Sequence, residues 1–237
     1  MCRTRNIILC LLLLVSPVTV AQSFQQQGSP PQLVELYTSQ GCSSCPPADR
    51  RLATLLNHPQ LWRRFVPMAF HVDYWDYLGW QDRFAQPEYT QRQRALNRSG
   101  QFRSVYTPAW LIDGREWRGF FSRQDWPDPV AIDGGVLTAE LTGQQLQVSY
   151  QSTKAIDQPT VHVALLGFDR TTEIAAGENR GSTSEHQFVV VDKQQRGGDI
   201  WLFSLPLSAA NGRAALAVWI TEAGRSQPRQ VLGGWID

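Results

Sequence analysis

The strongest constraint on this chain is a pair of cysteines placed where a strand ends and a helix begins. Cys42 and Cys45 are separated by two serines. Residues 33–38, LVELYT, favour a strand, and the Ser-Gln-Gly that follows them ends it. Two prolines at 46–47 fit the first turn of a helix, and the leucines within residues 52–56 continue at helical spacing. The order strand, C-x-x-C, helix is therefore the most informative part of the sequence.

This placement favours redox chemistry. The N–H groups and the dipole at a helix start stabilise a thiolate, which lowers the pKa of a cysteine such as Cys42. A thiolate is the species that attacks disulfides, and Cys45, one turn further on, can resolve the mixed disulfide. The intervening serines add no cation or histidine beside the nucleophile, which argues against a very strong oxidant. We predict that Cys42 and Cys45 are the catalytic residues.

The N-terminus has the pattern of a secretory signal peptide. Arg3 and Arg5 precede a short apolar run over residues 7–15, and Thr-Val-Ala at 19–21 offers small residues for cleavage. We therefore predict that residues 1–21 are a signal peptide. An uncleaved membrane anchor is the alternative, although the apolar run is short for a span.

The cysteine count gains meaning once the signal peptide is set aside. Cys2 and Cys10 leave with it, so the mature chain keeps only Cys42 and Cys45. A disulfide stabilises most when it closes a long loop, and this pair closes almost none. In an oxidising compartment a lone C-x-x-C indicates a redox or metal site rather than a stabilising cross-link.

Composition excludes several classes of protein. Apolar residues make up 42% of the chain and charged residues 18%, as in ordinary globular proteins. The 22 basic and 21 acidic residues nearly balance, which gives no electrostatic footprint for nucleic acid. We predict no nucleic-acid partner, no cofactor, no resident metal and no stable membrane span after signal cleavage.

The first half of the mature chain alternates strand and helix patterns. Residues 22–31 are polar and predict a flexible lead-in, and residues 65–72 predict a second buried strand. A long segment rich in aromatics and arginine follows, with a helix predicted over 88–97. Two strand-forming runs around Asp113-Gly114 predict a hairpin.

The pattern changes after a linker rich in proline and glycine that begins near residue 126. Beyond it, every apolar run is short and bounded by turns, without helical periodicity, which is typical of an antiparallel β-sandwich. We predict one domain over residues 32–130 and a β-sandwich domain over 131–237. The expected strands are 136–141, 146–150, 161–168, 187–191, 200–205, 214–220 and 231–236.

Two segments of the first half resemble glutaredoxins and thioredoxins. Residues 33–45 are similar to the opening of glutaredoxins, and Thr107-Pro108 with the hairpin after it is similar to the proline segment of both families. The resemblance implies an α/β thioredoxin-like N-terminal domain with a helical insertion. It also implies that the Thr107–Pro108 peptide is cis and faces the dithiol. Thr107, Pro108 and Tyr37 are then the expected substrate-binding residues.

A more specific resemblance is to secreted bacterial proteins catalogued as domain of unknown function 1223. It rests on VELYTSQGCSSCPPAD at 34–49, HVDYWD at 71–76 and VYTP at 105–108. It implies a secreted protein, located in the bacterial periplasm, and brings no established substrate. Those proteins often carry a polar residue directly after the proline, where this chain has Ala109.

Other titratable residues near these motifs have two interpretations each. Glu35 is either a salt-bridged glutamate or an acid near the dithiol. Asp73 and Asp76 either cap turns or lie buried at the site. His71 is either structural or a metal ligand beside the two thiolates, although a closed zinc module would need a fourth ligand.

Two further clusters are also open to two interpretations. The dense aromatics are either core or the wall of a substrate groove. The arginines of the expected helix are interpreted as a solvated face. The aromatics are Tyr74, Trp75, Tyr77 and Trp80, and the arginines are Arg92, Arg94 and Arg98.

The leading functional hypothesis is a periplasmic thiol–disulfide oxidoreductase acting on protein or small-molecule thiols and disulfides. A carrier of soft Cu(I) on the two thiolates is the first alternative. The second is a non-catalytic binding protein with a fixed disulfide. Substrate, electron donor and the direction of electron flow are left open by the sequence.

Overall fold

The computed structural model describes residues 21–237. The predicted signal peptide, residues 1–21, lies outside the described residues except for Ala21. Within the described part, no helix has the length and apolar character needed to cross a membrane.

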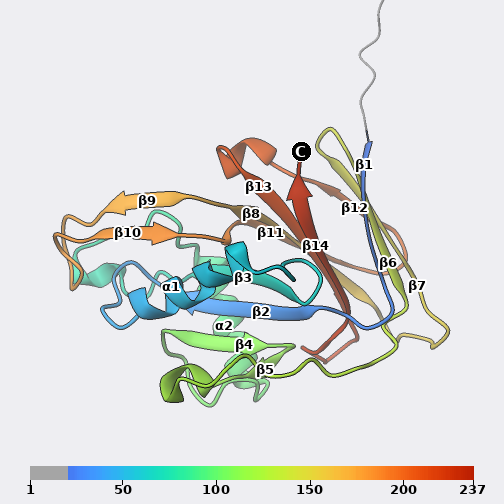
Figure 1. Ribbon diagram of the computed structural model, residues 1–237, viewed down its shortest axis with the longest axis horizontal. Helices are drawn as coiled ribbons and strands as arrows, with labels where there is room; N and C mark the ends of the chain where they lie inside the picture. The colour runs from blue at the N-terminus through green and yellow to red at the C-terminus, as the bar shows by residue number, and fades with distance from the viewer. Residues whose placement is uncertain (1–20) are drawn as a thin grey trace, which may run out of the picture.

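The larger of the sheets has eight strands, in the order β14-β13-β8-β11-β3-β2-β4-β5 (Figure 1). β2 and β3 are parallel, and β4 is antiparallel to β2. β11 joins the two halves of the sheet, because its Val189 pairs with Ala69 of β3 on one side and with Gly167 of β8 on the other. The strands are β2 (Gln32–Thr38), β3 (Phe65–His71), β4 (Ala109–Ile112), β5 (Arg115–Glu116), β8 (Thr160–Gly167), β11 (Val189–Gly197), β13 (Ala214–Thr221) and β14 (Pro228–Ile236).

The predicted fold class is therefore wrong. We expected an α/β thioredoxin-like domain with a helical insertion, followed by a separate antiparallel β-sandwich. The chain is instead mostly β, with two α-helices in the described residues, and one sheet takes strands from both halves. β11 pairs with the edge of β3 that local sequence patterns leave free, and covering an exposed edge is favourable. The predicted boundary at residue 130 stays a prediction, although strands from both sides of it share this sheet.

A four-stranded sheet, β1-β6-β7-β12, packs on the β8, β13 and β14 end of the large sheet (Figure 1). Its strands are β1 (Ala21–Gln27), β6 (Val136–Thr142), β7 (Gln145–Gln151) and β12 (Trp201–Ser204). The buried residues between the sheets include Leu137, Leu146, Val163, Phe203, Leu216 and Leu232. β1 corrects the expected flexible lead-in over residues 22–31. It pairs antiparallel with β6 along its length, through backbone hydrogen bonds that its glutamine-rich sequence does not signal.

Two helices cover opposite faces of the central strands. α1 (Pro46–Ala53) and α2 (Pro87–Arg98) both begin with proline, as the sequence predicted. The cross-strand pair Tyr37 and Phe70 lies on the α2 face, where Phe70 packs against Tyr89. The next pair, Thr38 and His71, points to the other face, because successive strand residues alternate.

A short hairpin of β9 (Arg170–Glu173) and β10 (Thr183–His186) forms a separate two-stranded sheet beside α1 (Figure 1). It comes from the second half of the chain but lies over the cysteine segment of the first. The remaining elements are the 3-10 turns η1 (Thr54–Asn57), η2 (Asp76–Leu78), η3 (Gly119–Ser122) and η4 (Leu207–Ala210).

Candidate functional site

Cys42 and Cys45 form a disulfide at the start of α1, with their Cα atoms 5.4 Å apart. Cys45 is the N-cap residue of the helix, and its carbonyl accepts the N–H groups of Ala48 and Asp49 at 2.8 and 3.1 Å. The Cys42 sulfur lies 3.4 Å from the hydroxyl oxygen of Ser44. The expected placement of the pair between a strand and a helix is thus confirmed.

The surroundings of the disulfide give a thiolate limited support. The first two residues of α1 are prolines, so this helix start lacks two of the N–H groups that normally face an anion. Ser43 donates its backbone N–H to the carboxylate of Glu178 at 3.1 Å, which places a negative charge beside Cys42. The helix dipole still favours an anion here, and the nearby carboxylate opposes it.

Both cysteines are buried, Cys42 to 1% exposure and Cys45 to 0%. The cover is the loop between β9 and β10, residues 174–182. From this loop, the side-chain amide of Asn179 donates to the backbone oxygens of Gln40 at 2.8 Å and of Cys42 at 3.0 Å. A reactant therefore reaches the sulfurs only when this covering loop moves.

Trp75 connects the disulfide loop to the Thr107–Pro108 segment, whose peptide is cis. Its indole N–H donates to the Thr107 hydroxyl at 2.8 Å. Its Cβ packs so closely on Gly41 that a side chain at position 41 would start 3.0 Å from it. Trp75 thus belongs to the site, and Thr107 and Pro108 are both buried. Their role in substrate binding stays a prediction.

The backbone of Tyr37 pairs with Ala109, the residue after Pro108, but its side chain points elsewhere. It is fully buried on the α2 face, where it stacks on Phe70, and its hydroxyl contacts Glu35 and Arg92. The substrate-binding role expected for Tyr37 also stays a prediction, but its side chain points into a second cluster, away from α1.

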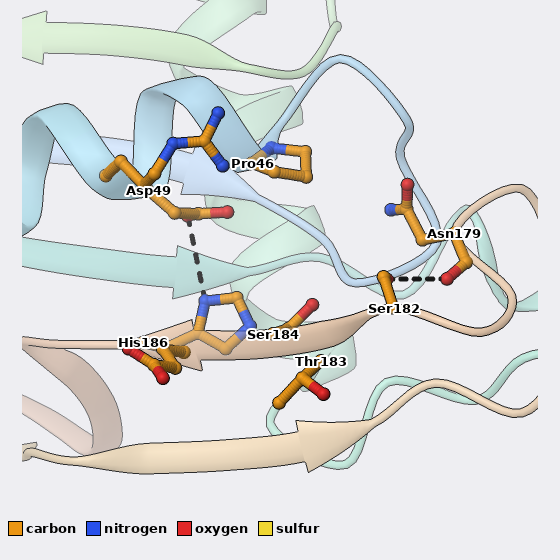
Figure 2. Close-up of a pocket in the computed structure, with 9 residues that line it drawn as sticks. Pro46, Asp49, Asn179, Ser182, Thr183, Ser184 and His186 are labelled. Atoms are coloured by element: carbon orange, nitrogen blue, oxygen red, sulfur yellow. Dashed lines mark hydrogen bonds and ion pairs between the residues drawn. The ribbon is translucent and has the colours of Figure 1, made fainter.

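A pocket of about 320 Å³ lies between α1 and β10 (Figure 2), and its lining residue Pro46 directly follows Cys45. Asp49 from α1 and His186 from β10 both line it and point toward each other, with Asp49 Oδ1 3.8 Å from His186 Nδ1. Both side chains are buried, and neither ring nitrogen of His186 has a hydrogen-bond partner. The lining residues are Pro46, Asp49, Arg50, Asn179, Ser182, Thr183, Ser184, Glu185 and His186.

Behind the pocket, His71 and Asp82 form a buried ion pair, with His71 Nδ1 2.7 Å from Asp82 Oδ2. Burial by itself lowers the pKa of His71, but the charge and hydrogen bond of Asp82, with the charge of Asp49, outweigh it and raise the pKa. Burial raises the pKa of Asp82, but His71 and the N–H groups of Gln40 and Phe84 lower it overall. The ring centroids of His71 and His186 lie 4.7 Å apart. Asp82 therefore links this cluster to the segment that precedes Cys42.

On the opposite face, Arg92 and Glu35 form a second buried ion pair. Arg92 Nη1 lies 2.6 Å from Glu35 Oε2, and Nη2 donates to Oε1 at 3.2 Å. Burial lowers the pKa of Arg92, but Glu35 and Tyr37 reverse the effect and raise it. The interpretation of Glu35 as salt-bridged is confirmed, whereas Arg92 does not belong to a solvated face as predicted.

Several site residues were missed from the sequence. Asp49, Asp82, Asn179 and His186 were not among the predicted site residues, and no spacing relates the last two to the cysteines. The turn interpretation of Asp73 and Asp76 is confirmed, because their backbone oxygens accept the N–H groups of Asp76 and Gly79 in tight turns, and neither residue is fully buried. Within residues 21–237, no group of three or more histidines, cysteines and acids is arranged to hold a metal ion. In the disulfide, neither sulfur is a thiolate ligand, so the copper hypothesis stays untested.

Two solved structures are similar in fold to this chain. A protein from Agrobacterium tumefaciens is 25% identical, with a TM-score of 0.56 over 89% of this chain and 96% of its own. HBP35 of Porphyromonas gingivalis is 11% identical, with a TM-score of 0.52 over 89% of this chain and 76% of its own, and shares the fold alone. The chain belongs to the family described as protein of unknown function DUF1223, whose model matches residues 33–221. No curated protein matches it.

Proposed function

We propose that this protein is a thiol–disulfide oxidoreductase that works outside the cytoplasm. The observation that carries the proposal is a disulfide between residues three apart, at the start of a helix. Such a bond joins no distant parts of the chain, and its loop is far shorter than the 15-residue loop that gives about 3 kcal/mol of stabilisation. The resemblance of the cysteine and proline segments to thioredoxins and glutaredoxins supports the same reading.

The reaction is an exchange of two electrons and two protons. In the oxidised protein, a substrate thiolate attacks the sulfur of Cys42, forms a mixed disulfide and releases the thiolate of Cys45. A second substrate thiolate attacks the substrate sulfur of that mixed disulfide, which yields a substrate disulfide and frees the thiolate of Cys42. Two protons from the substrate thiols end on the two cysteines. Reduction of a substrate disulfide is the same sequence in reverse.

The environment of Cys42 favours a reducing rather than a strongly oxidising couple. Pro46 and Pro47 offer no N–H groups to a thiolate, and the Glu178 carboxylate at the Ser43 N–H repels one. Since a less stabilised thiolate makes the disulfide harder to reduce, we expect a potential nearer to about −270 mV than to about −120 mV, the values of thioredoxin and of a strong dithiol oxidant.

The test is a redox titration of the full mature chain in glutathione or dithiol buffers, with free thiols trapped and counted by mass spectrometry. Reversible two-electron behaviour and turnover of a model disulfide are expected, and Cys42→Ser should abolish turnover. Ser43→Ala is the matched control, since the Ser43 side chain is exposed and the change leaves both cysteines in place. Full turnover by Cys42→Ser would refute the proposal.

The burial of both sulfurs favours a second candidate, a binding protein whose disulfide is permanently closed. In that case the potential would lie below about −300 mV, as in structural disulfides, and no disulfide would be turned over. The same titration decides between the two candidates.

A further inference from the structure

The pocket beside the disulfide contains a buried carboxylate whose ion-pair neighbour within the described residues is a histidine. Asp49 is 8% exposed, and no lysine or arginine among residues 21–237 lies within ion-pair distance of it. Its nearest ionisable neighbour is His186, at 3.8 Å, which is too far for a hydrogen bond. Burying a carboxylate without a cation or a full set of donors is unfavourable. The pocket is therefore incomplete as the protein folds it.

His186 shows the same deficit independently. It is 3% exposed and lines the pocket (Figure 2), yet both of its ring nitrogens lack a hydrogen-bond partner. In a native protein nearly all such groups are satisfied, by protein, water or a ligand. Two buried groups that line one cavity point to an occupant that donates hydrogen bonds.

The charge of the lining selects among possible occupants. Asp49 and Glu185 are acidic, while Arg50 is the one permanent cation among the lining residues, and it is exposed. The histidine of the buried pair behind the pocket is already matched, because His71 lies against Asp82. A cavity of about 320 Å³ is at the lower end of the range for small-ligand sites, so it fits one side chain or one small molecule.

We propose that this pocket receives a cationic group, an ammonium or a guanidinium, carried by the thiol or disulfide that exchanges with Cys42 and Cys45. This inference rests on the proposed function. The pocket adjoins the reactive pair through Pro46, the residue after Cys45, and through Asn179, which is bonded to the Cys42 carbonyl. A substrate with a positive charge close to its sulfur is thereby selected over a neutral or acidic one.

The test uses the reduced protein and three small disulfides that differ mainly in charge: bis(2-aminoethyl) disulfide, bis(2-hydroxyethyl) disulfide and the disulfide of 3-mercaptopropionate. Each rate constant is divided by that of a small dithiol with the same disulfide, because leaving-group pKa alone changes the rate. We expect the normalised rate for the amine to exceed that for the alcohol by about tenfold, the effect of one hydrogen bond to a charged group, with the acid slowest. Equal normalised rates, or a faster acid, would overturn the inference.

Asp49→Asn should reduce the tenfold preference to near unity, whereas Glu140→Gln, which removes an exposed carboxylate on β6, should leave it unchanged. Glu185→Gln changes an exposed pocket residue and keeps the inference testable if Asp49→Asn does not fold; we expect it to reduce the preference by about half. Peptide disulfides with lysine, alanine or glutamate beside the cysteine distinguish a basic polypeptide from a free amine as the source of the charge. A preference that survives both pocket variants would contradict the assignment.

A binding measurement separates this inference from the proposed function. 1,4-Diaminobutane is titrated into the oxidised protein and followed through the His186 ring signals by NMR. Binding that is lost in Asp49→Asn, without any disulfide turnover, would support the cation pocket and refute the oxidoreductase. Turnover without charge preference and without diamine binding would support the oxidoreductase and refute the cation pocket.

Discussion

Two buried ionic clusters lie on opposite faces of β2 and β3, and they are built differently. On the α2 face, Arg92 binds Glu35 through two nitrogens and also contacts Tyr37, so donors and acceptors are matched. On the α1 face, the His71 ring of the His71 and Asp82 pair packs edge to face with His186, and three ring nitrogens of the two histidines have no hydrogen-bond partner. Only the second cluster borders the disulfide and the pocket lined by Asp49 and His186, whereas Arg92 of the first cluster lines a separate pocket.

From this difference we expect the matched cluster to serve stability and the unmatched cluster to serve function. A matched buried pair contributes to the fold because breaking it leaves an uncompensated charge. Unmatched buried groups are unfavourable in the free protein, and they persist where another requirement holds them in place. The α2 face is therefore expected to respond to mutation mainly in stability, and the α1 face mainly in reactivity.

The largest effect is expected from breaking the matched cluster. Arg92→Ala leaves Glu35 buried at 1% exposure without its cation, which should lower the free energy of unfolding by about 3–5 kcal/mol. Urea unfolding followed by fluorescence measures it. Arg94→Ala, on the exposed side of the same helix, should change stability by less than about 0.5 kcal/mol. Similar losses in both variants would contradict the contrast between the clusters.

On the α1 face, the contribution of the His71 and Asp82 pair to stability should depend on pH. The pKa of His71 is raised in the folded protein, so its contribution to stability is complete below about pH 6.5 and is lost as pH rises through the folded value. The pKa of Asp82 is lowered, so its contribution is lost only in acid, as pH falls below about 3.9 and through the folded value. Between these limits the pair should stabilise the protein fully.

The measurement is the free energy of unfolding of the wild type minus that of His71→Gln, from pH 5 to 9. The difference should fall with pH by at most about 1.4 kcal/mol per unit, the value for one proton. Lys193, whose pKa burial and Arg92 lower to about 7, gives the opposite slope, but it is present in both proteins and cancels. A difference that rises with pH would contradict the assigned pair.

The cover over the disulfide should control its accessibility. Asn179→Ala removes the two hydrogen bonds that hold the covering loop on Gln40 and Cys42, so reduction of the folded protein by a small dithiol should become about tenfold faster. Thr183→Ala is the control, because it breaks the bond of Thr183 to Glu173 in the same hairpin without touching the disulfide loop. Equal acceleration in both variants would show that the hairpin opens as a whole.

The smallest effect on stability is expected at Asp49. Asp49→Asn removes a favourable charge from the first turn of α1, worth about 0.3–1 kcal/mol, and also removes an unpaired buried carboxylate. Because these effects oppose each other, thermal unfolding should give a change within about 1 kcal/mol. A loss as large as that expected for Arg92→Ala would place Asp49 among the residues that hold the fold.

Local elements could be predicted from the sequence because each depends on neighbouring residues. The strand before Cys42, the helix opened by two prolines, the hairpin at Asp113-Gly114 and seven strands after residue 131 were expected and are present, whereas β9 and β10 were not predicted. Their assembly could not be predicted, because one pairing, Val189 with Ala69, joins residues 120 positions apart and has no local signal. A β-rich half that extends the sheet of the first half looks the same in sequence as a separate sandwich.

The same distinction between local motifs and long-range pairing applies to the residues of the site. The cysteines and the Thr107-Pro108 segment carry motifs, so they were found. Asn179 and His186 are an ordinary asparagine and histidine in a turn and a short strand, and only the fold brings them to α1. His71 was considered from its position after a strand, but its partner Asp82 lies in a loop that follows no pattern.

The origin of the covering loop has a consequence for how the protein is made. Asn179 follows Cys42 by 137 residues, so during synthesis the two cysteines emerge long before the segment that covers them. The nascent chain therefore passes through a stage in which both thiols are open to solvent. The pair can first be oxidised at that stage, whereas in the finished protein the loop that arrives last lies over it.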